Sequence, residues 1–157
     1  MTDTTLGIAE LAARIPFLLS QLGAYLADDF ERRLAPIGVD PRAYAVLLAL
    51  AECDGQSQRE LSTQLGIHRN AMVTVIDTLE HQRLVQRLTH PQNRRAFAVT
   101  LTDKARDLLP ALYEPIDALE DEITAGLSAE ERAVLLKLLQ RLSAGAGLIP
   151  GVHPRLG

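Results

Sequence analysis

The sequence is poor in cysteine and in aromatic residues. Its single cysteine, Cys53, cannot form a disulfide within the chain and excludes the cysteine-rich zinc modules. Tryptophan is absent and aromatic residues make up 4% of the chain, so the core must consist mainly of Leu, Ala, Val and Ile. No apolar run approaches the roughly 20 residues of a membrane-spanning helix. We therefore expect no cofactor, no metal site and no membrane partner.

The first residues also lack the features of a secretory signal. The stretch 1–5 has neither a basic start nor an apolar run, so we expect a cytoplasmic location. The 157 residues are 47% hydrophobic and 23% charged, a balance typical of one ordinary folded domain. We therefore treat residues 1–157 as a single domain.

Charge is unevenly distributed along the chain. The formal net charge is −4, yet residues 68–95 contain five arginines and two acidic side chains, a local charge of +3. Three of the four histidines also lie in this block. Local potential, more than the overall isoelectric point, guides a polyanion to a protein. The block is therefore a candidate nucleic-acid surface, although many basic patches are simply solvated.

Leucine-rich helical periodicity dominates both ends of the chain. Apolar residues recur every three or four positions over residues 15–34, where Pro16 fits the first turn of a helix. Residues 103–145 show the same periodicity. Within them, Pro110 and Pro115 predict a kink or a break.

Capping signals divide the centre of the chain into short helices. Asp40 followed by proline predicts a helix start, and the next segment is apolar nearly all round, as expected of a central helix. Ser57 and Glu60 form a capping box that begins a second helix. Gly66 predicts the end of that helix in a left-handed conformation, and a third helix is predicted over residues 68–81.

Beyond residue 81 the hydrophobic period changes from about 3.6 to about 2 residues. Segments 84–89 and 95–102 are predicted strands, and residues 90–94 between them have turn chemistry, so the pair forms a hairpin with a basic tip. A short helix, a glycine turn, a second helix and a basic hairpin follow the plan of a winged helix-turn-helix. The predicted fold class is therefore mainly α with a small β-hairpin wing (α+β).

The chain resembles the multiple-antibiotic-resistance regulator (MarR) family of bacterial transcription factors from about residue 10 to residue 143. The resemblance implies a triangular homodimer in which residues 1–36 and 103–145 form intertwined dimerisation helices and residues 40–102 form the winged lobe. Residues 146–157 lack periodicity and are expected to form a flexible tail. The motifs that carry the resemblance are Gln58-Arg-Glu-Leu-Ser-Thr-Gln-Leu-Gly-Ile67, Val75-Ile-Asp-Thr-Leu-Glu80, Leu84-Val-Gln-Arg87, Asn93-Arg-Arg95 and Val99-Thr-Leu-Thr102.

The same resemblance implies a homodimeric repressor, of the kind that serves stress responses, whose lobes read the halves of a pseudo-palindromic double-stranded DNA operator. It also implies release by a small aromatic or phenolic ligand bound between the lobe and the dimer helices. Two alternatives stay open. One is a winged-helix module that binds proteins instead of DNA, and the other is a thiol-based redox regulator that uses Cys53. This cysteine has no basic neighbour in the sequence, so we expect it to be a buried small hydrophobe.

Three positions depart from the family pattern. Asn93 stands where the family usually has an aspartate, two residues before the critical wing arginine Arg95, so a salt bridge that steers the wing is lost. Arg83 replaces a common glycine and makes a left-handed turn less favourable. Thr74 replaces a common arginine of the recognition helix. The preferred DNA sequence should therefore differ from that of familiar members.

Candidate DNA contacts fall into three groups. Asn and Arg side chains at the start of a recognition helix suit adenine and guanine edges, and wing arginines suit the negative potential of the minor groove. Backbone N–H groups at the start of the preceding helix suit phosphate. The candidates are His68, Arg69, Asn70, Val73 and Thr74 in the recognition helix, Arg94 and Arg95 in the wing, and Ser57, Gln58 and Arg59 in the preceding helix.

Other side chains are weaker candidates for function. Asp77 and His81 lie four residues apart, but no third ligand completes a metal site, so a surface pair is expected. No nucleophile elbow and no phosphate-binding glycine loop occur in the sequence, so we expect no catalytic residue and no enzyme activity. Sparse aromatic and polar residues on the outer helices are candidate effector contacts, with core packing as an equal alternative. These are Phe17, Gln21, Tyr25, Arg42, Tyr44 and Tyr113.

Overall fold

A computed structural model describes residues 7–157, and the expectations for residues 1–6 lie outside this range. Within it, a two-stranded antiparallel sheet accompanies a mainly helical chain, which confirms the predicted fold class. The elements are α1 (Ala9–Ala12), α2 (Ile15–Leu34), the 3-10 helix η1 (Ala35–Ile37), α3 (Pro41–Glu52), α4 (Gln58–Leu65), α5 (Arg69–His81), β1 (Val85–His90), β2 (Asn93–Leu101), α6 (Asp103–Ile123), α7 (Ala129–Gly145) and the 3-10 helix η2 (Pro154–Leu156).

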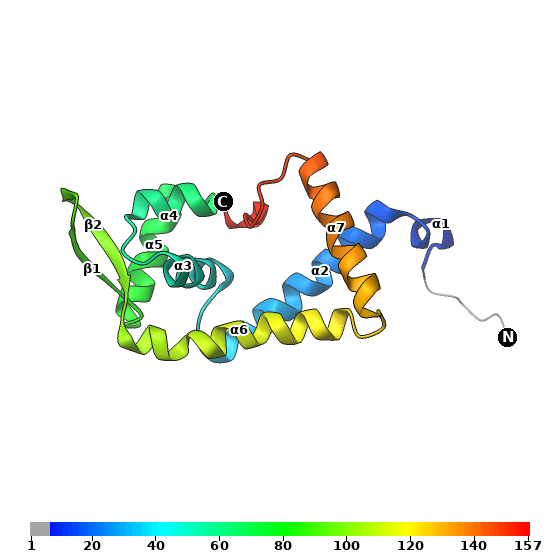
Figure 1. The fold of residues 1–157 in the computed structure, drawn as a ribbon, viewed down its shortest axis with the longest axis horizontal. Coiled ribbons are helices and arrows are strands. Elements are labelled where there is room, and N and C mark those ends of the chain that lie inside the picture. The colour runs from blue at the N-terminus through cyan, green and yellow to red at the C-terminus, as the bar shows by residue number, and fades with distance from the viewer. Residues whose placement is uncertain (1–6) are drawn as a thin grey trace.

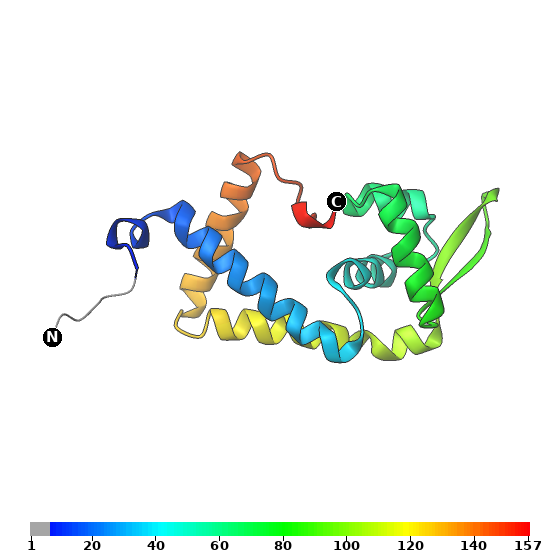
Figure 2. The same ribbon diagram turned by 180° about the vertical axis from the view of Figure 1, so that it is seen from behind.

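The elements gather at two ends of an elongated molecule, as Figure 1 shows from one side and Figure 2 from behind. Helices α3, α4 and α5 and the hairpin β1–β2 lie together at one end and form the winged lobe. Helix α1, the first part of α2, and α7 lie at the other end. Helix α6 runs along the molecule between the two ends, packed against α2.

The predicted capping groups start and end the helices of the winged lobe. The Asp40 carboxylate accepts a hydrogen bond of 2.8 Å from the Ala43 backbone N–H at the start of α3. Ser57 and Glu60 form both bonds of the capping box at the start of α4. Gly66 ends α4 with φ at +65°, a left-handed conformation that glycine adopts without strain. These three local predictions are confirmed.

The core of the winged lobe surrounds α3. This helix buries side chains over most of its circumference, as its nearly all-round apolar sequence predicts. Helices α4 and α5 pack their apolar sides against it, and strand residues close the core from the wing side. The large side chains with almost no exposure are Leu34, Val46, Leu47, Leu50, Leu61, Met72, Ile76, Leu79, Val85, Val99 and Leu112.

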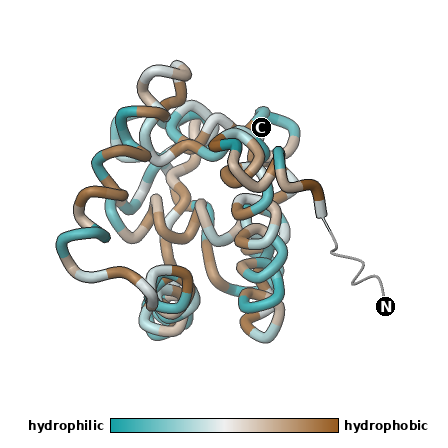
Figure 3. Tube along the Cα trace, turned by 90° about the vertical axis from the view of Figure 1, so that its right-hand side faces the viewer, coloured by the Kyte–Doolittle hydropathy of each residue, from teal (hydrophilic) through white to brown (hydrophobic). Residues whose placement is uncertain are grey.

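The opposite end of the molecule exposes much of its apolar surface. Helix α7 has no buried residue, although Leu135, Leu138, Leu139 and Leu142 follow one helical stripe. The first half of α2 is similarly exposed, and brown hydrophobic stretches recur along the helices in the end-on view of Figure 3. Contiguous apolar surface of this kind marks a protein interface. The exposed residues at this end are Ile8, Ile15, Phe17, Leu18, Leu19, Leu22, Tyr25, Val134, Leu135, Leu136, Leu138, Leu139 and Leu142.

Helix α6 continues through both of its prolines, so the break we considered is not formed. A proline inside a helix removes one backbone hydrogen bond and crowds the preceding turn. Packing against α2 compensates, because Leu112, Pro115 and Leu119 are all buried on one side of α6. An ion pair of 2.5 Å between Arg33 of α2 and Glu122 of α6 holds the far end of the helix.

The segment 146–157 also departs from expectation. We expected a flexible tail there, but the structure folds its last residues back onto the winged lobe. Leu156 is partly buried against the core, and η2 forms a short turn around it. In Figure 1 the segment crosses from the end of α7 to the neighbourhood of α3 and α4. Periodicity did not reveal this placement because the docking residues are irregularly spaced.

Among the described helices, none alone has the length and apolar composition to cross a membrane. One bent pair, residues 15–37 with Pro41–Glu52, passes that test together, but its two halves meet at 73°. The second half of this pair is α3, the central helix of the lobe core.

Candidate nucleic-acid interface

Helix α5 presents one face to the lobe core and the other to solvent. Its buried residues Met72, Val75, Ile76 and Leu79 recur at helical spacing and fix the orientation of the helix. The predicted DNA-facing residues therefore lie on the free face. They are Arg69, Asn70, Val73 and Thr74, all of them exposed, with Val73 at 46%.

The start of α5 is organised by His68. Its Nδ1 accepts a hydrogen bond of 3.3 Å from the Asn70 backbone N–H, so His68 caps the helix. The Thr74 hydroxyl donates to the Asn70 backbone carbonyl at 3.3 Å, which holds it along the helix. The Asn70 side chain is free of these bonds. Among the predicted contacts at this end, the polar side-chain groups of Asn70 and Arg69 thus face solvent and form no hydrogen bond within the helix start.

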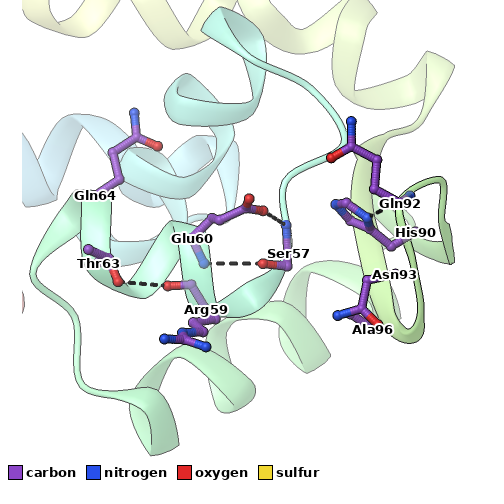
Figure 4. Close-up of a pocket in the computed structure, with 9 residues that line it drawn as sticks. All are labelled: Ser57, Arg59, Glu60, Thr63, Gln64, His90, Gln92, Asn93 and Ala96. Atoms are coloured by element: carbon purple, nitrogen blue, oxygen red, sulfur yellow. Dashed lines mark hydrogen bonds between the residues drawn. The ribbon is translucent and has the colours of Figure 1, made fainter.

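A cavity of about 650 Å³ separates the start of α4 from the turn of the wing (Figure 4). The Ser57 backbone N–H donates to the Glu60 carboxylate at 2.7 Å. This bond, together with the Ser57 hydroxyl, lowers the pKa of Glu60. Arg59 is exposed on the same helix, whereas Gln58 is half-buried and its amide nitrogen has no partner among the described residues. Ser57 therefore serves first as a cap.

The wing is a twisted hairpin in which Val85 pairs with Leu101 and Thr89 with Phe97. The turn lies at residues 91–92, so Arg94 and Arg95 belong to β2 and both are exposed. The Asn93 side-chain oxygen accepts a bond of 3.1 Å from the Arg95 backbone N–H. The amide thus orders the backbone at the wing tip where the family's aspartate is missing.

The base of the wing is attached to two other elements. On the outer edge of β2, the Val99 backbone N–H donates to the Gln56 carbonyl at 2.7 Å, and the Gly55 backbone N–H donates to the Val99 carbonyl at 3.1 Å. On β1, Arg87 donates to Asp77 of α5 at 2.5 Å and also to Glu80. The wing is therefore fixed both to the segment before α4 and to the recognition helix α5.

This use of Arg87 was missed from the sequence. We counted it in the basic block, but the two carboxylates of α5 neutralise it and its side chain is only 18% exposed. Asp77, expected to pair with His81, is engaged with Arg87 instead. The sequence does contain a signal for this contact. Asp77 and Glu80 lie three residues apart on α5, and Arg87 follows seven residues after Glu80. The exposed positive charge of the predicted contacts thus comes from Arg59, Arg69, Arg94 and Arg95.

Arg83, which links α5 to β1, has φ at +60° and is the one described non-glycine residue in the left-handed region. Its backbone carbonyl accepts a bond of 2.7 Å from the Thr102 hydroxyl. The turn keeps the geometry expected for a glycine although an arginine occupies it. Conformational strain is the consequence, since the side chain crowds its own backbone in this region.

Cys53 is exposed, so our expectation of burial is wrong. It follows the last residue of α3 in an extended conformation, with φ at −143°, and this turns it away from the lobe core. The carboxylate of the next residue, Asp54, pairs with Arg106 at 2.5 Å. Within residues 7–157, no three His, Cys, Asp or Glu side chains are grouped as a metal site.

A second cavity of about 650 Å³ lies between α2, α3 and the folded-back segment. Arg42 and Tyr44, two predicted effector contacts, line it, whereas Phe17, Gln21, Tyr25 and Tyr113 lie outside its lining. Tyr44 packs edge-to-face on Phe30 with ring centres 5.0 Å apart. Burial, and then the neighbouring Tyr113 and Asp117, raise the pKa of Tyr44, and its buried hydroxyl has no hydrogen-bond partner among the described residues. We call this space the α2–α3 cavity.

An exposed helix held beside a basic hairpin, on a lobe distinct from the apolar outer helices, defines the class of winged helix-turn-helix DNA-binding proteins. The comparisons with known proteins narrow this class. Residues 39–97 match the sequence model of the MarR family. The transcriptional repressor CouR, in a structure bound to a 23-mer DNA duplex, aligns with a TM-score of 0.76 and 31% identity over 89% of this chain and 99% of that chain.

Two further structures are similar. CouR from Rhodococcus jostii RHA1, bound to p-coumaroyl-CoA, gives a TM-score of 0.73 and 27% identity over 91% of this chain and 97% of that chain. The apo form of MarR from E. coli gives 0.70 and 22% identity, with 82% and 96% covered, and shows the fold alone. The chain belongs to the MarR family, as the sequence resemblance predicts, and is a DNA-binding transcriptional regulator.

Proposed function

We propose that the protein is a homodimeric repressor that binds a pseudo-palindromic operator and leaves it when a small aromatic acid, or its thioester, is bound. The observation that carries the proposal is the exposed face of α5 beside the two free wing arginines. We further propose a bacterial, cytoplasmic setting, a role in a stress response, and no catalytic activity.

The homodimer is proposed from the exposed apolar helices. Helix α7 and the first half of α2 leave more than ten large apolar side chains at solvent. A second copy would bury them through the same surface on both subunits, as a two-fold interface requires. The domain organisation proposed from the sequence follows, with 1–36 and 103–145 as dimerisation segments and 40–102 as the lobe.

The DNA contacts are proposed by region. The exposed side chains of α5 would enter the major groove, with Asn70 and Arg69 at base edges and Thr74, Val73 and His68 beside them. Arg94 and Arg95 would reach the minor groove. Arg59, together with backbone groups at Ser57 and Gln58, would hold phosphate. Two such lobes must lie about 34 Å apart to meet successive major grooves, so a small change in their spacing releases the DNA.

The effector is proposed to bind in the α2–α3 cavity. The two CouR complexes with p-coumaroyl-CoA show that relatives of this chain bind an aromatic acyl thioester. The cavity offers the aromatic pair Phe30 and Tyr44 beside the guanidinium of Arg42. This combination suits a ligand with a flat apolar body and an anionic group.

The decisive experiment is selection of binding sequences from random duplex DNA, with the mass of the complex measured by analytical ultracentrifugation. We expect an inverted repeat bound by two protomers. An Arg94→Ala/Arg95→Ala double variant serves as the matched comparison and should lose most of the affinity. Failure to enrich any sequence, with no affinity for duplex DNA at low salt, would contradict the proposal and favour a protein-binding module. Addition of p-coumaroyl-CoA, with coenzyme A as control, tests release.

A further inference from the structure

The folded-back segment makes three contacts with the winged lobe, at places far apart in the sequence. Leu156 packs partly buried against the lobe core. Arg42, at the start of α3, donates from Nε to the Leu156 carbonyl at 2.9 Å and from Nη2 to the Gly157 carbonyl at 3.3 Å. Val152 lies against Gly66 in the turn between α4 and α5. The segment therefore connects the α2–α3 cavity with the helix-turn-helix.

The contact with Val152 leaves little room for a side chain at Gly66. A Cβ added at this glycine would lie 3.0 Å from Val152 Cγ1, closer than most carbon contacts allow. Gly66 also needs its left-handed φ of +65°, so this turn has two reasons to be glycine. One reason is local and the other depends on the docked segment. Val152 therefore packs beside the turn that sets the angle between α4 and the recognition helix.

The same segment forms one wall of the α2–α3 cavity. It contributes Leu156, His153 and Arg155, opposite Phe30 and Tyr44. Carboxylates also reach the rim, since Glu31 and Asp40 line the cavity and Asp40 caps α3 through Ala43. An apolar interior with mixed charge in its lining suits a mainly apolar ligand body whose anionic group meets Arg42 and avoids Glu31.

We propose that residues 152–157, which form one wall of this cavity, also fill part of the space that an effector needs, and that Arg42 is their latch. We call these residues the occupant. The inference rests on the proposed effector site and adds its regulation. With the cavity empty of ligand, the Arg42 guanidinium holds the carbonyls of Leu156 and Gly157. The carboxylate or phosphate of an entering aromatic acyl ligand takes the guanidinium from the Leu156 carbonyl, because a charged acceptor binds it more strongly than a neutral peptide carbonyl does. The segment then leaves, and Val152 leaves the turn at Gly66.

The latch is tested first without ligand, by hydrogen exchange and mass spectrometry of the full chain. Arg42→Gln removes the charged donor, and we expect backbone exchange over residues 150–157 and 64–68 to rise at least fivefold. Lys137→Gln, on the side of α7 opposite its apolar stripe, removes one positive charge elsewhere and should leave both segments unchanged. Equal exchange of the segment in wild type and Arg42→Gln overturns the latch. A circular dichroism melt confirms that both variants fold.

The occupant is tested with p-coumaroyl-CoA and p-coumarate as probes, by calorimetry. Leu156→Ser weakens the docking of residues 152–157 and should tighten probe binding about threefold to tenfold. The reason is that only the fraction of molecules whose segment has left the cavity can bind the probe. Leu148→Ser, an exposed leucine outside the cavity lining, is the control and should change nothing. Probe binding should also accelerate exchange over residues 150–157.

The outcomes separate the two proposals. One outcome is that wild type binds the probe tightly, the exchange of residues 150–157 does not change on binding, and Leu156→Ser binds the probe with wild-type affinity. This outcome overturns the occupant and leaves the proposed repressor intact. Absence of probe binding in wild type and in Leu156→Ser overturns the proposed effector class, and with it the displacement by ligand. Faster exchange in Arg42→Gln would then still establish the latch as a contact of the ligand-free fold.

Discussion

Arg87 of the wing and Asp77 of the recognition helix form an ion pair of 2.5 Å that joins the two DNA-facing elements of the lobe. Glu80, one helical turn further, accepts from the same guanidinium. A planar guanidinium held by two carboxylates has little freedom to turn, so it fixes the angle of the hairpin relative to α5. One arginine of the basic block is therefore structural, and its charge is not available to phosphate.

Replacement of Arg87 should weaken DNA binding without loss of a phosphate contact. We expect Arg87→Gln to lower operator affinity roughly fivefold to tenfold, about 1 kcal/mol, because the wing is no longer held. The dependence of affinity on salt should stay as in wild type, since the paired charge releases no counterion. Titrations at four salt concentrations measure both quantities. Arg106→Gln removes another ion pair, which joins α6 to Asp54 of the lobe, and should change neither quantity.

Replacement of Arg95, unlike replacement of Arg87, should change the salt dependence of DNA binding. Arg95→Ala removes an exposed charge at the wing, so the slope of log K against log salt should fall by about 0.9 and affinity for all duplex sequences should fall together. Lys137→Ala, on the side of α7 opposite its apolar stripe, controls for overall charge and should leave the slope unchanged. A slope identical in wild type and Arg95→Ala would place the wing tip away from the DNA backbone.

Local signals in the sequence predicted the lobe well because each is complete within a few residues. The Ser57–Glu60 capping box needs only four positions, and the left-handed Gly66 follows from the end of an amphipathic turn. The strands were placed to within two residues, since the hairpin is set by alternation and a turn. The family motifs then added the arrangement of these elements, which no single signal contains.

The sequence failed where partners come from distant elements. The Arg87 ion pair requires the register of a strand beside a helix, and the docking of Leu156 against α3 joins residues 114 positions apart. Cys53 was expected inside because it has no basic neighbour in the sequence, but one extended residue after α3 is enough to turn it outward. Helix α6 survives Pro115 because tertiary packing against α2 outweighs the lost backbone bond.

Asn70 should determine one base pair in each half-site. Its side chain is free at the start of α5, while its backbone groups carry the bonds to His68 and Thr74, so Asn70→Ala removes base contact and leaves the helix start intact. We expect discrimination at that position to fall by about 1–3 kcal/mol, with other positions unchanged. Selection from random DNA with both proteins gives the comparison. Thr78→Ala, two turns further along α5, should retain the wild-type preference, and a preference unaltered in Asn70→Ala would remove this residue from base readout.

Arg83 should be replaceable by glycine with a gain in stability. A side chain at φ +60° costs about 1–2 kcal/mol, and glycine relieves this cost but loses more backbone entropy on folding, which leaves a net gain of about 0.5–1 kcal/mol. For a chain of this size the gain corresponds to roughly 1–4 °C in Tm, measured at equal protein concentration. Arg83→Ala is the matched control: it removes the same charge but keeps a Cβ in the left-handed region, so its Tm should stay at the wild-type value. Equal stabilisation by alanine and glycine would show that repulsion of the charge, and not backbone strain, destabilises this turn.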